Sequence, residues 1–344
     1  MLNNIIYIQH FMIKFLLPVA TMCFTTFAYS AVQNVAKFND VRPANVAVDS
    51  KGNVFATMHP LDNPKTKLVK VQDEKFLEFK IDGVEIANAI GIHIDSKDNL
   101  YILDLTGKLI VWNLVEKKLN KIYEIPENVK IKTSFLQDFA LDEKRNIVYI
   151  ADMGQLIDEA HPGIIALNLN NGQAKRLFDG SDKVLGGKSP IVVDGKPFMQ
   201  KNDEQEHLYF GLNPIAFDCE KDYLYFAAMS RGKMYKIKGK YIANFELSQE
   251  KLEKKTKVAF EKPSTDGIKA KNGIVYITNI ENNTIQAVNG KKVTTLAENL
   301  NWADGLFIRD GKIYATVNQL HKSAALNSGK EMAKKPYAII STEI

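Results

Sequence analysis

A short pattern of apolar and polar positions recurs six times along the chain. Each copy has an apolar triplet, a polar turn rich in Asp, Asn or Gly, and a second apolar triplet that contains an aromatic residue. The paired triplets are residues 46–48 and 54–56, 92–94 and 100–102, 139–141 and 148–150, 215–217 and 224–226, 268–270 and 275–277, and 306–308 and 313–315. Turns of this composition between apolar runs predict six β-hairpins.

The spacing of the copies predicts the fold. The aromatic residues Phe55, Tyr101, Tyr149, Tyr225, Tyr276 and Tyr314 are separated by 46, 48, 76, 51 and 38 positions. A period of roughly 40–50 residues with several strands in each unit is typical of a β-propeller blade. We therefore predict an all-β, six-bladed β-propeller that forms a single domain over residues 31–344, because blades bury their faces only against neighbouring blades.

The long interval of 76 residues contains an insertion over residues 180–207. An insertion of this length either forms a loop over one face of the ring or contributes a seventh blade. We favour the loop, and long loops on a rigid scaffold often border binding sites.

The N-terminal segment has the pattern of a secretory signal peptide. A short basic stretch at residues 12–14 precedes an apolar run over residues 15–27, and Ala28 and Ser30 supply the small residues before a cleavage site at Ala31. The alternative is an anchoring helix, but the apolar run is shorter than the roughly 20 residues that span a bilayer. We therefore predict a secreted or periplasmic protein with no membrane association after cleavage. It would keep one cysteine, Cys219, and form no internal disulfide.

Composition and charge are those of an ordinary globular protein, with 45% hydrophobic and 25% charged residues. The net charge of +5 is spread along the chain and gives little support to nucleic-acid binding. We expect a monomer whose partner is a small molecule.

Antiparallel geometry predicts where the site lies. If the first strand of each hairpin is innermost, the residues just before it and just after its partner share one rim of the ring. Acids, amides and a histidine gather on this rim, whereas the hairpin turns occupy the other. The candidate ligand-binding residues are Asn45, His59, Asp138, Asp152, Asn213, Asp266, Asp304 and Asn318. We expect a site at the mouth of the central channel on this rim.

One feature of the register conflicts with a single site. Asn45 and Asp138 come one position later in their strands than Asn213, Asp266 and Asp304. Neighbouring positions of a strand face opposite sides, so the five side chains share the channel only if the strands bend where they begin. Otherwise these residues cap strand ends and turns.

Several segments together resemble the Yellow and major royal jelly protein family. They are RPANVAV (42–48), MHP (58–60), NPKTKL (63–68), FLQD (135–138), IADMG (150–154), STDG (264–267), NIENN (279–283), ADG (303–305) and VNQLH (317–321). The resemblance implies a secreted six-bladed propeller. It also implies that a small ligand, such as an aromatic amine, binds at the channel mouth, although enzymatic activity is uneven in the family.

A more distant likeness favours catalysis. LNPIA (212–216) and TDGI (265–268) are similar to segments of gluconolactonase-like propellers. The likeness implies a Ca²⁺ ion held by Asn213 and Asp266, and hydrolysis of a lactone or ester in which Asp266 transfers protons. The first blade, however, offers Asn45 where those enzymes have a glutamate. Nucleophile-elbow, zinc-protease, phosphate-loop and dinucleotide motifs are absent from the sequence.

Overall fold

The computed structural model describes residues 31–344, except for residues 74, 155–160, 188–189, 199, 202–205 and 208–209. The predicted signal peptide, residues 1–30, lies outside the described residues. No helix in the described part of the chain is long and apolar enough to cross a membrane.

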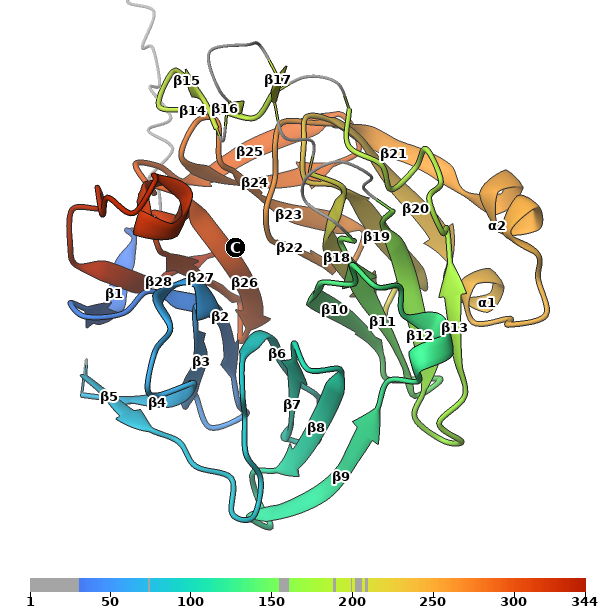
Figure 1. Cartoon of the computed structure of the whole chain (residues 1–344), viewed down its shortest axis with the longest axis horizontal. Coiled ribbons are helices and arrows are strands. Elements are labelled where there is room, and N and C mark those ends of the chain that lie inside the picture. Colours follow the sequence, from blue (N-terminus) through green and yellow to red (C-terminus); the bar gives the residue numbers. More distant parts are fainter. Residues whose placement is uncertain are drawn as a thin grey trace, which may run out of the picture.

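Six four-stranded antiparallel sheets are arranged in a ring around a common axis and form a six-bladed β-propeller (Figure 1), as the repeat predicts. We call the region along this axis the central channel. The strands of the first three blades, from the centre outward, are β2 (Pro43–Val48), β3 (Val54–Met58), β4 (Leu68–Gln72) and β5 (Lys75–Glu78); β6 (Ala89–Ile94), β7 (Asn99–Asp104), β8 (Lys108–Asn113) and β9 (Lys118–Glu124); and β10 (Leu136–Asp142), β11 (Ile147–Asp152), β12 (Gly163–Asn168) and β13 (Ala174–Leu177).

The last three blades follow the same order. Their strands are β18 (Leu212–Asp218), β19 (Tyr223–Ala228), β20 (Gly232–Lys238) and β21 (Lys257–Lys262); β22 (Ile268–Lys271), β23 (Ile274–Asn279), β24 (Thr284–Asn289) and β25 (Lys292–Ala297); and β26 (Ala303–Arg309), β27 (Lys312–Val317), β28 (Tyr337–Glu343) and β1 (Gln33–Phe38). Two short helices, α1 (Gly239–Ile242) and α2 (Gln249–Lys255), connect β20 to β21 at the periphery (Figure 1).

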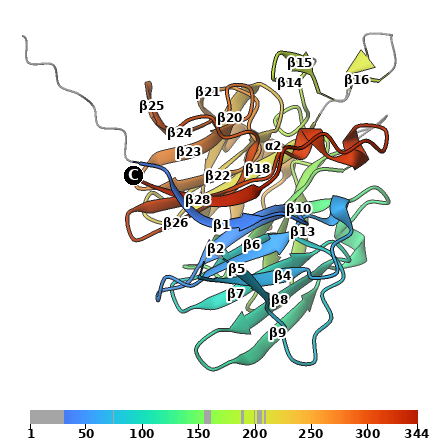
Figure 2. The same cartoon turned by 90° about the vertical axis from the view of Figure 1, so that its left-hand side faces the viewer.

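The N-terminal strand closes the ring. In the sixth blade, β1 supplies the outermost strand and pairs antiparallel with the C-terminal strand β28. Figure 2 shows β1 and β28 side by side. The first and last strands are thus linked by backbone hydrogen bonds within one sheet, which holds the ring closed.

The register of the hairpins confirms the repeat. The middle residue of each first triplet pairs with the aromatic residue of the second, as in Ala47 with Phe55, Ala140 with Tyr149 and Ala216 with Tyr225. These aromatic rings are buried in apolar clusters with neighbouring strands. Packing between blades therefore explains why the pattern recurs.

The insertion in the third interval, between the third and fourth blades, forms two short hairpins, β14 (Val192–Val193) with β15 (Lys196–Pro197) and β16 (Gln200–Lys201) with β17 (Glu206–His207), rather than a seventh blade. Ile191, Val193 and Phe198 pack against loops of the ring in one apolar cluster with Trp302 and Leu320. The insertion thus lies over one rim, as we expected.

Candidate functional site

The channel has two ends, which we call the upper mouth and the lower mouth. The inner strands begin at the upper mouth, and the hairpin turns between the first two strands of each blade lie at the lower mouth. The register shifts near the start of five inner strands, between Pro43 and Val46, Ala89 and Ile92, Leu136 and Asp138, Leu212 and Ile215, and Ala303 and Leu306. These irregularities bend the strands where they begin, which is the condition under which residues offset by one position can share the channel.

Asp266 is held by side chains from both neighbouring blades. Its side chain is buried, and its two oxygens accept hydrogen bonds from the Asn213 amide (2.5 Å) and the Trp302 indole N–H (2.8 Å). Burial raises the pKa of Asp266 to about 6, and the negative charge of Asp138 adds to the rise, whereas the two hydrogen bonds oppose it. The carboxylate is therefore mostly ionised at neutral pH, at a place where negative charge is poorly solvated.

Two further aspartates share this environment. Asp304 accepts a hydrogen bond from the Asn318 amide (2.7 Å), and Asp138 accepts one from the backbone N–H of Phe139 (2.8 Å). Burial raises the pKa of Asp138, and burial together with the charges of Asp266 and Asp138 raises that of Asp304. Three carboxylates that destabilise one another's ionised forms favour a cation between or above them.

Asn45 completes the group at the channel. It is buried on β2, and a Cβ atom at Gly305 of the sixth blade would collide with its side-chain oxygen. A Cβ atom at Gly267 would likewise collide with the backbone oxygen of Asp304. The two glycines therefore allow neighbouring blades to approach closely around the channel.

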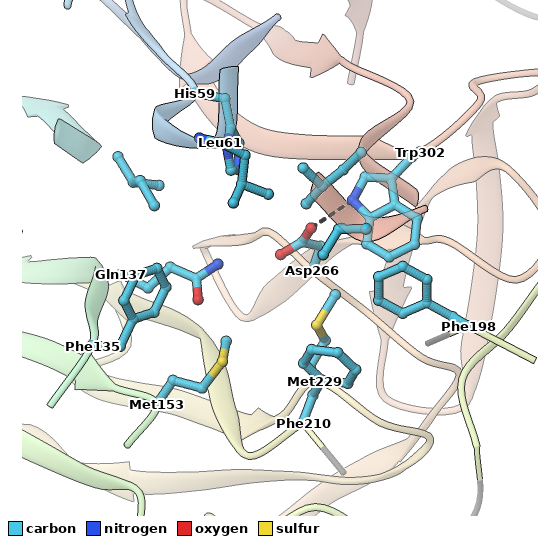
Figure 3. Close-up of a pocket in the computed structure, with 13 residues that line it drawn as sticks. His59, Leu61, Phe135, Gln137, Met153, Phe198, Phe210, Met229, Asp266 and Trp302 are labelled. Atoms are coloured by element: carbon cyan, nitrogen blue, oxygen red, sulfur yellow. Dashed lines mark hydrogen bonds between the residues drawn. The ribbon is translucent and has the colours of Figure 1, made fainter. Parts of the chain in front are cut away.

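An apolar cavity of about 100 Å³ opens beside Asp266 (Figure 3). Its lining residues are His59, Leu61, Ile90, Phe135, Gln137, Met153, Phe198, Phe210, Met229, Asp266, Trp302, Leu320 and Leu326. Figure 3 shows the Asp266 carboxylate among aromatic rings and methionine side chains. The side-chain oxygen of Gln137 is buried and has no hydrogen-bond partner among the described residues. The cavity thus offers a carboxylate, a free acceptor and apolar walls.

Trp302 connects the carboxylate to the insertion. Its ring is fully buried and lies between those of Phe198 and His321, with centroids 5.0 Å and 5.3 Å away. Its backbone has φ = 56°, a left-handed conformation that is rare for a bulky residue. Strained conformations of this kind cluster at functional sites, where the surrounding structure maintains them.

His59 contributes a neutral ring to the cavity. Its Nδ1 accepts a hydrogen bond from the backbone N–H of Leu61 (3.2 Å) at the start of the short helix η1 (Pro60–Asp62). Burial, and then the positive charge of Arg42, lower the pKa of His59 to about 3. The imidazole is therefore uncharged at neutral pH.

The hydrogen bonds of Asp152 differ from those of the other predicted residues. Its carboxylate accepts hydrogen bonds from Ser134, from the backbone of Phe135 and Gly154, and from Arg176 (2.6 Å). It does not line the cavity. The structure thus brings Asn45, Asp138, Asn213, Asp266, Asp304 and Asn318 to the channel and His59 to the cavity, and it gives Asp152 a role in joining loops of the third blade.

The apolar walls of the cavity did not appear among the predicted site residues. Trp302 lies two positions before Asp304, and Met153 directly follows Asp152. A search that included large apolar residues beside the polar rim positions would have found both.

The family of the chain follows from its sequence. The sequence profile of the major royal jelly protein family matches residues 88–330, more than half of the chain. The chain belongs to the major royal jelly protein family. This match confirms the predicted resemblance and extends from the second blade to the loop before β28. No curated protein sequence matches the chain significantly.

Solved structures with the same fold differ widely from this family member in sequence. Regucalcin from Agrobacterium tumefaciens, a calcium-binding protein, is 10% identical with a TM-score of 0.58, covering 92% of this chain and 94% of that one. A gluconolactonase from Xanthomonas campestris is 8% identical with a TM-score of 0.55, covering 92% and 90%. Virginiamycin B lyase from Staphylococcus aureus is 12% identical with a TM-score of 0.50, covering 91% and 99%. These similarities establish the propeller fold.

The predicted Ca²⁺ ligands lie together but do not complete a site for the ion as they are arranged. Ca²⁺ takes six to eight oxygen ligands, whereas Asn213 turns its amide nitrogen toward Asp266, and both Asp266 oxygens already accept N–H hydrogen bonds. Within the described ranges, no group of three or more His, Cys, Asp or Glu side chains is placed to hold a metal ion.

Proposed function

We propose that this family member binds a small amine with a compact apolar body at the upper mouth of its channel. The observation that carries the proposal is the position of the Asp266 carboxylate at an otherwise apolar, aromatic cavity. A ligand ammonium group would meet Asp266, and its body would contact the rings and methionines.

The chemistry of the cavity favours a cation over a neutral ligand. The ammonium group would relieve the repulsion among Asp138, Asp266 and Asp304, and the unpartnered oxygen of Gln137 accepts one of its hydrogen bonds. Aromatic rings add attraction for a cation, typically about 0.5–2 kcal/mol. An apolar cavity of about 150 Å³ holds benzene, so a cavity of about 100 Å³ would enclose the amine-bearing end of a ligand such as benzylamine and leave part of the ring outside it.

The proposal describes a binding protein that acts outside the cytoplasm as a monomer. The signal-peptide pattern of residues 1–30 supports export, and the thinly spread charge gives no support to nucleic acid as a partner. A ligand-binding propeller in that location would capture or deliver a small molecule without chemistry.

A second candidate function is Ca²⁺-dependent hydrolysis of a lactone or ester. It is supported by the adjacency of Asn213 and Asp266 and by the raised pKa values of Asp138, Asp266 and Asp304. We favour the amine site over the hydrolase for two reasons. Both Asp266 oxygens already accept hydrogen bonds, and the first blade offers Asn45 in place of a glutamate.

The test compares benzylamine with benzyl alcohol by titration calorimetry. We expect saturable binding of benzylamine, and at least about tenfold weaker binding of the uncharged alcohol. Asp266→Asn should weaken benzylamine binding by at least about 100-fold, because truncating one partner of a buried charge pair typically costs 3–5 kcal/mol. Glu298→Gln, which removes an exposed carboxylate elsewhere, is the control and should change the affinity less than twofold.

Equal affinities for the two probes, or for wild type and Asp266→Asn, would refute the amine site. The same protein is then assayed with glucono-δ-lactone after EDTA treatment, with and without added Ca²⁺. Turnover that requires both Ca²⁺ and Asp266 would replace the proposal with the hydrolase.

A further inference from the structure

A second cavity, of about 230 Å³, occupies the lower mouth, at the opposite end of the channel from the amine site. Its walls include the rings of Phe217 and Phe307, the imidazole of His93, and the cationic side chains of Lys269 and Arg309. Basic, aromatic and polar groups thus surround one hollow on a rim that the sequence assigned only to turns.

The two cations are available to a ligand. Lys269, on the inner strand β22, makes no hydrogen bond or ion pair with another side chain in the described part of the chain, and it is partly buried. Arg309 donates from Nε to the backbone oxygen of Val48 (3.0 Å), and its guanidinium lies 5.7 Å from the centre of the Phe307 ring. This anchoring fixes the guanidinium plane and leaves its terminal nitrogens without a partner among the described residues.

The positive charges converge on the same point. The His93 ring lies 5.5 Å from that of Phe307, between centroids. Burial, then the positive charge of Lys269 and then that of Arg309, together lower the pKa of His93 to about 3. Both cations therefore lie near His93, and the imidazole between them is neutral at neutral pH.

The acidic residues of this cavity do not neutralise the two cations directly. Asp95 accepts hydrogen bonds from the backbone N–H groups of Lys97 (2.9 Å) and Asn99 (2.8 Å) in its own hairpin turn. Glu143 accepts from the backbone and hydroxyl of Ser96. Glu220 is exposed at the edge of the cavity. The carboxylates are therefore engaged in the turns or solvated, and the unengaged groups are cationic.

We propose that the lower mouth binds a small, flat organic carboxylate. Lys269 and Arg309 would hold the carboxylate, since a guanidinium accommodates two oxygens side by side. The rings of Phe217 and Phe307 would contact the flat body. This site is distinct from the amine site, because it uses different residues at the other end of the channel.

The experiment titrates the protein with benzoate at low ionic strength. We expect saturable binding that Lys269→Met weakens by at least about tenfold, the scale of a lost hydrogen bond to a charged group. Lys257→Met removes the same charge from an exposed position on β21 and should change the affinity less than twofold. Absence of saturable benzoate binding, or equal affinities of wild type and Lys269→Met, would overturn the proposal.

A measurement on the wild-type protein keeps the proposal testable if Lys269→Met does not fold. Acetylation of individual lysines by acetic anhydride is followed by mass spectrometry with and without benzoate. Benzoate should slow the acetylation of Lys269 and leave that of Lys257 unchanged. Equal rates at Lys269 with and without benzoate would overturn the site.

Discussion

The two mouths of the channel are built by the same six repeats, yet their chemistry is opposite. At the upper mouth, buried carboxylates receive hydrogen bonds from amide and indole groups, as Asp266 does from Asn213 and Trp302, and the insertion covers the rim with Phe198. At the lower mouth, Lys269 and Arg309 line a cavity whose carboxylates are hydrogen-bonded within the hairpin turns or exposed. The repeat thus determines the scaffold, and the residues that depart from it determine the chemistry of each end.

The channel is polarised between these ends. Asp138 near the upper mouth and Lys269 near the lower mouth are close enough to affect each other's ionisation. Burial raises the pKa of Asp138 and lowers that of Lys269, and each charge opposes the shift of the other. Opposite charges along one channel therefore limit the cost of burying either.

The largest expected effect tests how closely the upper mouth is packed. In the fifth blade, Gly267 lies at the upper mouth, where a Cβ atom would collide with the backbone of Asp304. Gly273 lies in the lower hairpin turn with φ = 87°, and a Cβ atom there would meet only the Lys221 side chain, at ordinary contact distances of 3.6 Å and 3.7 Å. Gly267→Ala should lower the free energy of unfolding by about 3 kcal/mol or more. Gly273→Ala should lower it by about 1–2 kcal/mol through backbone strain alone.

Urea denaturation of both variants measures the difference. Equal losses would mean that the upper mouth relaxes as readily as an exposed turn, and the contrast in packing between the two ends would be wrong.

The next largest effect is a difference in how pH changes ligand affinity at the two mouths. Because the pKa of Asp266 is raised to about 6, lowering the pH from 7 to 5 should protonate it and weaken benzylamine binding by about tenfold. The proposed benzoate-binding side chains, Lys269 and Arg309, carry no carboxyl group, so benzoate affinity should change less than twofold over this range. Calorimetric titrations at both pH values provide the test, and a parallel fall for both ligands would contradict the assignment of the titrating group to the upper mouth.

The raised pKa of Asp266 also affects the stability of the fold. A carboxyl group whose pKa is higher in the folded state than in the unfolded chain binds its proton more tightly when folded. The free energy of unfolding should therefore decrease as the pH rises from about 4 to about 6. Asp266→Asn should flatten part of this decrease in urea denaturation curves, while Asp138 and Asp304 retain the rest.

The smallest expected effect concerns the edge of the lower mouth. Lys271 lines the cavity near the hairpin turn, one strand position beyond Ala270. A partly exposed charge is screened by solvent and salt, so Lys271→Met should weaken benzoate binding only about two- to threefold, against at least tenfold for Lys269→Met. If Lys271→Met had the larger effect, the carboxylate would bind at the edge rather than beside His93.

The fold could be predicted from the sequence because the blade is a local and repeated unit. Pairing each apolar triplet with the next requires only a short turn, and six copies determine the ring. The polar upper rim was predictable for the same reason, since antiparallel strands bring Asp266 and Asp304 to one end. The bends that reconcile Asn45 and Asp138 with them depend on local register shifts that an alternating pattern does not encode.

The walls of the upper cavity and the site at the lower mouth could not be predicted in this way. Trp302 meets Phe198 of the insertion only in three dimensions, across a separation of about one hundred residues. Lys269 was counted as the middle of an apolar triplet, although it is the charged member of its set of six equivalent positions. A charge inside a repeated apolar pattern is a departure that indicates function.

The pairing of β1 with β28 has a consequence for the order of events during synthesis. Gln33 lies opposite Ser341, so the sixth blade remains incomplete until β28 has emerged. Earlier blades are able to assemble one after another, but the ring stays open, and long-range pairing of this kind is slow. A chain released before β28 has been made would therefore lack the strand that holds β1, and its ring could not close.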